Sequence, residues 1–250
     1  MKICPGAWLN ASPAFPPNRL NNDAFRVALC MRLGVPLADQ HQACPHCGGM
    51  DDAFGQHAWR CSGLRGAGNT RHTLTNNTLL SVCQHAGFTA SKEVPYEEHF
   101  PRNPNAPADS QTTKNRIDTL VQLPSGTKIV IDVTIRHVTH GSSHEIRGAS
   151  AAAAEKDKVR FISDRYTIPS RDIIPFAFET YGNMGEAAKN FVRSAAKNKA
   201  GDNKVAYAQL VNFYRSRIAV AVQRGNLIAI NRWLYRRRTA AQGSAGGGSG

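Results

Sequence analysis

The sequence lacks several features that would assign it to a simple class. It contains no apolar run long enough to cross a bilayer, and no internal repeat is apparent. Residues 1–17 are too polar and too rich in proline for a secretory signal peptide. The six cysteines are spaced too irregularly for the disulfide framework of a small secreted protein. We therefore expect a reducing compartment, in which clustered thiols bind metal.

Acidic side chains are scarce. The 250 residues include 18 Asp and Glu against 31 Lys and Arg, which gives a formal net charge of +13. Such an excess attracts polyanions, either nucleic acid or an anionic membrane. Only the segment around Trp233 and Tyr235 approaches the basic amphipathic helix that a membrane surface requires. The charge therefore favours nucleic acid, and we expect no membrane partner.

Hydrophobic periodicity and turn residues predict an α/β fold, with a mixed central sheet flanked by helices. Strands are expected at 88–93, within 116–136 and at 173–180. Helices are expected at 24–34, 73–86, 149–161, 185–199 and 204–224, with one or two further turns over 227–237. The predicted parts are an N-terminal arm and helix (1–40), a zinc knuckle (41–66), a sheet-containing core (67–182), basic helices (183–238) and a flexible tail (239–250).

Two aspartates in the predicted hairpin are candidate metal ligands. The segment Leu-Pro-Ser-Gly at 123–126 predicts a tight turn, so a hairpin can bring Asp118 and Asp132 to one end of the sheet. An ionised carboxylate within the apolar run around Asp132 requires a cation or several hydrogen-bond donors. The pair therefore predicts a hard cation, Mg²⁺ or Mn²⁺. In the alternative interpretation, Asp118 caps a turn and Asp132 pairs with an arginine.

Cysteine and histidine residues form a second candidate metal site, with the spacing C-x2-C-x9-H-x3-C. This spacing is typical of a structural, tetrahedral Zn²⁺ site, in which glycines after the first pair let the backbone turn around the ion. The expected ligands are Cys44, Cys47, His57 and Cys61. His41 and His46 lie near enough to compete, but the spacing between His57 and Cys61 places both on one helical face and favours His57.

The helix expected at 149–161 carries a candidate catalytic lysine. Hydrolysis of a phosphodiester benefits from a cation near the reacting phosphate. Lys158 shares a helical face with the apolar Phe161 and should point toward the sheet, whereas Lys156 should project toward solvent. The alternative is that Lys158 is a solvated lysine on a basic helix. Glu93 is either a third carboxylate of the site or a solvated residue at a strand end.

Other basic residues are candidates for phosphate contacts. Arg71 and His72 open the helix expected at 73–86, where a phosphate site and a solvated cap are both possible. Basic residues of the C-terminal third predict a phosphate track. The candidate nucleic-acid ligands are Arg71, His72, Arg116, Lys156, Arg193 and Arg224.

Eight segments follow one another along the chain in a characteristic order. They are AFRVALCMRLGVP, CPHC with HAWRC, RHTLTNNTLL, GFTASKEVPYE, RIDTLV with IVIDVTI, AEKDKVRF, IIPFAFETYGNMGEAAKNF and IAVAVQRGNLIAI. In this order they resemble the restriction-like endonuclease of non-long-terminal-repeat retrotransposons, a domain of their reverse transcriptase polyproteins. The resemblance covers nearly the whole chain and implies a PD-(D/E)XK nuclease core at 67–182 behind a CCHC zinc knuckle.

The resemblance also implies roles for individual residues. Asp118 and Asp132 correspond to the two metal-binding acids, with the Val133 carbonyl as a further ligand, and Lys158 corresponds to a catalytic lysine that has moved from the strand to the next helix. Two departures from the family pattern are Thr134, which occupies the usual lysine position, and Ile117, which replaces the usual proline.

The expected function is therefore a Mg²⁺- or Mn²⁺-dependent endonuclease that nicks target DNA in the nucleus to prime reverse transcription. Its expected partners are double-stranded DNA, including branched DNA, the element's RNA and the reverse transcriptase domain of the full element. Two alternatives remain open. One is a zinc-containing nucleic-acid-binding module without cleavage, and the other is a junction-resolving nuclease.

Overall fold

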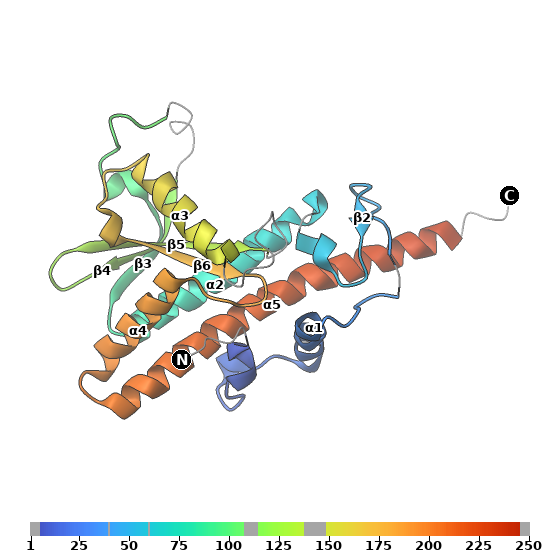
Figure 1. The fold of residues 1–250 in the computed structure, drawn as a ribbon, viewed down its shortest axis with the longest axis horizontal. Coiled ribbons are helices and arrows are strands. Elements are labelled where there is room, and N and C mark those ends of the chain that lie inside the picture. The colour runs from blue at the N-terminus through green and yellow to red at the C-terminus, as the bar shows by residue number, and fades with distance from the viewer. Residues whose placement is uncertain (1–5, 40, 60, 108–114, 138–148, 246–250) are drawn as a thin grey trace. The chain divides into compact units, whose positions relative to one another are not determined.

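The computed structural model describes residues 6–39, 41–59, 61–107, 115–137 and 149–245 (Figure 1). The chain divides into two compact units. Unit 1 consists of Met1–Ala11 and Thr75–Ala219, and unit 2 consists of Ser12–Leu74 and Val220–Gly250. Among the described residues, no helix combines the length and the apolar character needed to span a bilayer.

Unit 1 contains a four-stranded mixed sheet within the described ranges. The strand order is β3-β4-β5-β6, with β3 (Thr89–Pro95), β4 (Arg116–Gln122), β5 (Lys128–Arg136) and β6 (Ile173–Glu179). The first three strands are antiparallel, and β6 runs parallel to β5. The predicted hairpin is confirmed. Its turn is closed by the amide of Gly126, which donates to the Leu123 carbonyl at 2.9 Å, and Gly126 has the positive φ of 83° that glycine adopts at little cost.

Helices cover both faces of this sheet (Figure 1). Helix α3 (Ala149–Ser163) packs closely because Ala151 and Ala154 meet Ala177 of β6 in one buried cluster. On the opposite face, Phe191 of α4 (Glu186–Ala200) packs edge-on against Phe176 of β6, with ring centroids 6.0 Å apart. Successive strand residues point to opposite faces of a sheet. Phe176 and Ala177 therefore contact helices on opposite faces, α4 and α3 respectively. The predicted α/β fold with a flanked mixed sheet is thus confirmed.

Two long helices differ from the sequence prediction. Helix α2 (Arg65–His85) begins eight residues before the expected Thr73, and α5 (Lys204–Ala245) is continuous over 42 residues instead of ending near Arg224. A glycine in a helix costs only about 1 kcal/mol, which packing readily offsets. At Gly225 packing requires the glycine, because a Cβ there would lie 2.7 Å from the Arg71 Cα.

Unit 2 contains α1 (Asn22–Leu33) and a short hairpin of β1 (Gln42–Ala43) and β2 (Met50–Asp51). The Asn21 side chain caps α1 by accepting from the Ala24 amide at 2.8 Å. Ala24, Val27 and Ala28 form the buried side of α1, whereas Leu33 is 65% exposed at the helix end. Short 3₁₀ helices complete the two units, namely η1 (Ala7–Asn10), η2 (Pro16–Asn18), η3 (Gln56–Trp59), η4 (Ser62–Leu64), η5 (Tyr96–Glu98) and η7 (Ser170–Asp172).

Candidate functional site

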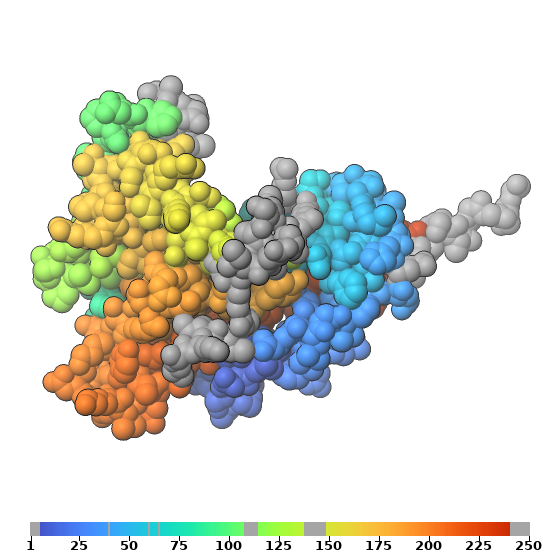
Figure 2. Space-filling model, viewed as in Figure 1, coloured from blue at the N-terminus to red at the C-terminus, as the bar shows by residue number. Residues whose placement is uncertain are grey.

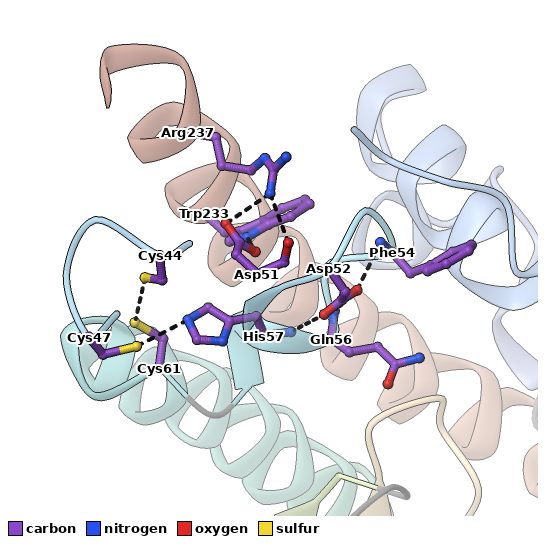
Figure 3. Close-up of polar contacts among 10 residues, drawn as sticks. All are labelled: Cys44, Cys47, Asp51, Asp52, Phe54, Gln56, His57, Cys61, Trp233 and Arg237. Atoms are coloured by element: carbon purple, nitrogen blue, oxygen red, sulfur yellow. Dashed lines mark hydrogen bonds and ion pairs between the residues drawn. The ribbon is translucent and has the colours of Figure 1, made fainter. Parts of the chain in front are cut away.

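The four expected zinc ligands come together in unit 2 (Figure 3). One ligand atom from each of Cys44, Cys47, His57 and Cys61 lies within 4.8 Å of all the others. The Cys44 and Cys61 sulfurs are 3.8 Å apart, and the Cys47 sulfur lies 3.4 Å from His57 Nε2. A tetrahedral zinc with Zn–S near 2.3 Å and Zn–N near 2.1 Å places its ligand atoms about 3.5–3.8 Å apart. The cluster can therefore hold a metal ion such as zinc, and its histidine is His57.

Backbone geometry positions these ligands. The Gly48 amide donates to the Cys44 carbonyl and the Cys44 amide donates to the Gly49 carbonyl, both at 2.9 Å, so the chain turns tightly between the first two cysteines. Gly48 has a φ of 68°, which glycine tolerates. On the other side, the Asp52 carboxylate accepts from the His57 amide at 2.8 Å and so fixes the start of η3.

The thiols have different proton affinities. Burial raises the pKa of Cys44, but hydrogen bonds from the backbone of Cys47 and His46 outweigh it and lower the pKa to about 7. Burial dominates at Cys61 and raises its pKa to about 11. Several thiolates cannot share so small a volume without a cation that compensates their charge. This donor set therefore fits Zn²⁺, which binds cysteine as the thiolate.

A buried ion pair that the sequence analysis missed anchors the β1–β2 hairpin to α5 (Figure 3). Asp51 is 1% exposed, and its Oδ2 lies 2.9 Å from a guanidinium nitrogen of Arg237, whose side chain is 8% exposed. The indole N–H of Trp233 donates to Asp51 Oδ1 at 2.5 Å. Arg237 belongs to the basic C-terminal third in which a phosphate track is expected, but its contacts make it a structural partner of Asp51.

The two aspartates of the hairpin lie beside each other in unit 1. The β4–β5 ladder ends at Thr119 and Ile131, so Asp118 and Asp132 are the next opposed residues and share one face of the sheet. Beyond this point a side chain provides the acceptor that a backbone carbonyl provides within the ladder. The Asp118 Oδ2 atom accepts a hydrogen bond from the Val133 backbone amide at 2.7 Å. Val133 itself is buried.

Lys158 reaches the same face of the sheet from α3. Its ammonium lies 2.6 Å from Asp132 Oδ1, and Asp132 is only 6% exposed. Lys156 is exposed. Helix α3 forms part of the molecular surface, where it is coloured yellow in Figure 2. Lys158 lies at the sheet and Lys156 is exposed, as expected, but Phe161, which was expected on the same buried face as Lys158, is 39% exposed. The Lys158 ammonium compensates the charge of the Asp132 carboxylate, which permits the burial of Asp132, while the Lys158 side chain is 31% exposed.

Glu93 and Asn76 border this acidic pair. Glu93 lies opposite Asp118 in the β3–β4 register and has a φ of 54°, which is strained for a residue other than glycine. The side-chain amide of Asn76, in α2, donates to the Asp118 backbone carbonyl at 2.8 Å and to Glu93 Oε1 at 3.4 Å. Glu93 is exposed. Asn76 could not be identified from the sequence, because nothing local distinguishes it from its neighbour Asn77.

The expected position of Arg71 and His72 at the N-terminus of a helix is wrong. Arg71 and His72 lie about two turns inside α2, because the helix begins at Arg65. Arg71 is buried, stacks over Trp59 at 5.0 Å and donates to Asn226 Oδ1 at 3.1 Å. Burial lowers its pKa to about 10. His72 is half-buried.

The other candidate nucleic-acid ligands differ in their surroundings. Arg116, the first residue of β4, is exposed, as is Lys156. Arg193 pairs with Glu186 at 3.3 Å and donates to Asn190. Arg224 donates to the carbonyl of Arg19 within unit 2. Arg116 and Lys156 therefore remain the more accessible of these candidates.

No protein family matches the chain, and no curated protein matches its sequence. Fold and site together define a mixed α/β protein with a Cys/His cluster suited to a metal ion such as zinc.

Proposed function

We propose that the chain is a divalent-metal-dependent DNA endonuclease of the PD-(D/E)XK type, with the restriction-like fold and the retrotransposon role that the sequence resemblance implies. The observation that carries the proposal is the contact of Lys158 with Asp132, directly beside Asp118. Two carboxylates and a lysine on one face of a sheet are the groups that metal-assisted phosphodiester hydrolysis requires.

The donor set fits Mg²⁺ or Mn²⁺. Hard cations prefer oxygen ligands, and the carboxylates of Asp118 and Asp132 and the carbonyl of Val133 would supply them. A carboxylate offers about four acceptor positions, so the contacts with Val133 and Lys158 are compatible with a metal as a further partner. When bound, the cation would supply Lewis-acid activation of the phosphate and of the attacking water.

The protein's own groups have separate tasks in this proposal. The Val133 amide holds the Asp118 carboxylate in one orientation. The Asp132 carboxylate holds the Lys158 ammonium at the site, where its positive charge offsets the charge that grows on the phosphate. The buried cluster that contains Val130 and Ile117 backs the site and keeps water from its base.

The charge of the chain supports DNA as the substrate. A net charge of +13 attracts a duplex without sequence preference, and the exposed Arg116 and Lys156 are the candidates for phosphate contacts near the acidic pair. The Cys/His cluster has four protein ligands and thus fits a closed, structural zinc site, which stabilises unit 2 and performs no chemistry.

A second candidate is a nucleic-acid-binding module without cleavage. It is favoured by the fact that Lys158 and the Val133 amide already compensate the two carboxylates within the protein. Both candidates predict DNA binding, and only the endonuclease predicts cleavage.

The test is nicking of supercoiled plasmid in the presence of Mg²⁺. The parent protein should nick the plasmid, whereas Asp132→Asn and Lys158→Ala should each lower the rate by about a hundredfold or more, as expected when a group that stabilises the transition state is lost. Arg160→Ala, which changes an exposed residue of the same helix, is the matched control and should keep most of the rate. Gel-shift affinity and circular dichroism check binding and folding for each variant.

Two outcomes would redirect the proposal. A folded parent that binds DNA but does not cut it, with Mg²⁺ or Mn²⁺, is a binding module. Equal rates for the parent and Asp132→Asn would show that any cleavage arises elsewhere. A four-way junction used as a parallel substrate tests the junction-resolving alternative.

A further inference from the structure

Tyr96 has a buried hydroxyl group whose partner is missing from the described part of the protein. The side chain begins η5, directly after β3, and is 2% exposed. Its ring stacks on Tyr166, with centroids 4.3 Å apart and planes inclined by 11°. Within the described ranges its oxygen has no hydrogen-bond partner. Tyr166 differs, because its hydroxyl donates to Glu97 Oε1 at 2.9 Å.

The Tyr96 side chain lies close to the acidic pair. It belongs to the same buried cluster as Ile117 and Val130, which precede Asp118 by one residue and Asp132 by two. Val130 and Asp132 point to the same face of β5, so this cluster lies on the face of the sheet that carries Asp132. Burial raises the pKa of Tyr96 far above its ordinary value, and the negative charges of Asp132 and Asp118 raise it further. The hydroxyl therefore remains protonated and can act as a donor at neutral pH.

A buried donor without an acceptor destabilises a folded protein, and natural proteins satisfy nearly all such groups. At a candidate catalytic site, the missing acceptor is most simply a group of the ligand. Its chemistry follows from the surroundings, because the Lys158 ammonium, which pairs with Asp132, and the Tyr96 hydroxyl are both donors. Both favour an oxygen with negative charge.

We propose that the Tyr96 hydroxyl donates a hydrogen bond to a phosphate oxygen of DNA bound beside Asp118 and Asp132. This inference rests on the proposed endonuclease function, and it adds a substrate-binding residue that the sequence analysis did not identify. Lys158 and Tyr96 then contact the phosphate from α3 and from the end of β3, respectively. The stack on Tyr166 holds the Tyr96 ring in place before the substrate binds.

The test compares Tyr96→Phe with Tyr166→Phe. Each variant keeps its ring and loses one hydroxyl. Tyr96→Phe should lower the rate of plasmid nicking about ten- to a hundredfold, the loss expected for a hydrogen bond to a charged group, and should weaken gel-shift affinity measured with Ca²⁺ in place of Mg²⁺. Its thermal midpoint should stay equal to that of the parent or rise, because no internal hydrogen bond is lost. Tyr166→Phe should lower the midpoint and keep the nicking rate.

The outcomes separate this inference from the proposed function. If the parent cuts DNA, and Tyr96→Phe cuts and binds as the parent does, the role of Tyr96 is overturned and the endonuclease stands. A midpoint lowered as much as in Tyr166→Phe would also overturn it, because the hydroxyl then has a structural partner such as a buried water. If the parent binds DNA without cutting it, the endonuclease proposal fails, and a weaker affinity of Tyr96→Phe would still support the phosphate contact.

Discussion

Replacing Arg237 by methionine tests the buried ion pair that anchors the β1–β2 hairpin. Arg237 and Asp51 are both nearly inaccessible to water, and 2.9 Å separates their charged atoms. Methionine fills much of the space of the arginine stem but cannot compensate the charge of Asp51. The remaining compensation is the hydrogen bond from the Trp233 indole at 2.5 Å.

The expected loss is large for a single substitution. Removing one partner of a buried pair costs about 3–5 kcal/mol, because the other charge stays in a medium of low dielectric constant. Since the Trp233 N–H still donates to Asp51, we expect Arg237→Met to lower the free energy of unfolding by about 3 kcal/mol. The double variant with Asp51→Asn should lose less than the sum of the two single variants, since neither charge is then left alone.

Urea denaturation at a fixed zinc concentration measures these losses, with tryptophan fluorescence as the signal. Arg238→Met is the matched control, because Arg238 is the next residue and is exposed. Surface substitutions change stability by about 0.5 kcal/mol or less. If Arg237→Met costs no more than Arg238→Met, the reasoning about a desolvated ion pair is refuted. Additive losses in the double variant would contradict the coupling of Asp51 with Arg237.

Two further predictions concern the metal cluster and the helix pair α3–α4. Removing zinc with a strong chelator should unfold unit 2, because the thiolates of Cys44 and Cys61 lose the cation that compensates their charge. Circular dichroism measures the loss of structure, and adding Zn²⁺ should restore it. An unchanged thermal midpoint would contradict this prediction. Glu155 caps α4 by accepting from the Ala187 amide at 2.9 Å, and burial raises its pKa above the ordinary 4.5. A raised pKa in the folded state gives stability that is present below the unfolded pKa and is lost as pH rises through the folded pKa. Glu155→Gln should therefore gain stability relative to the parent between pH 4 and pH 7, and parallel pH profiles of the unfolding midpoint would exclude this effect.

Local signals in the sequence were sufficient for several elements. The turn at 123–126 joins two neighbouring strands because proline fixes φ and glycine adopts the positive φ that the turn requires. The C-x2-C and H-x3-C spacings predict the metal cluster because each pair lies within one tight turn. The orientation of Lys158 was predicted from its spacing to Phe161, but Phe161 is 39% exposed. The buried residues that share a helical face with Lys158 are Ala154 and Ile162, each four residues away.

The ends of the long helices could not be predicted in this way. Gly225 resembles a helix breaker in the sequence, yet α5 continues through it because the glycine lets α2 approach at Arg71. Local propensities contribute about 1 kcal/mol at such a position, and packing with a distant segment outweighs them.

The sequence by itself therefore determined the hairpin, the metal ligands and the amphipathic helices, whose causes act over a few residues. Only the tertiary structure decided which charges are buried and with which partners. Arg237 and Arg238 are adjacent and chemically identical, yet Arg237 is buried against Asp51 and Arg238 is exposed. The free energy of a charge depends on its desolvation and on groups far away in the chain, and neither is a property of the local sequence.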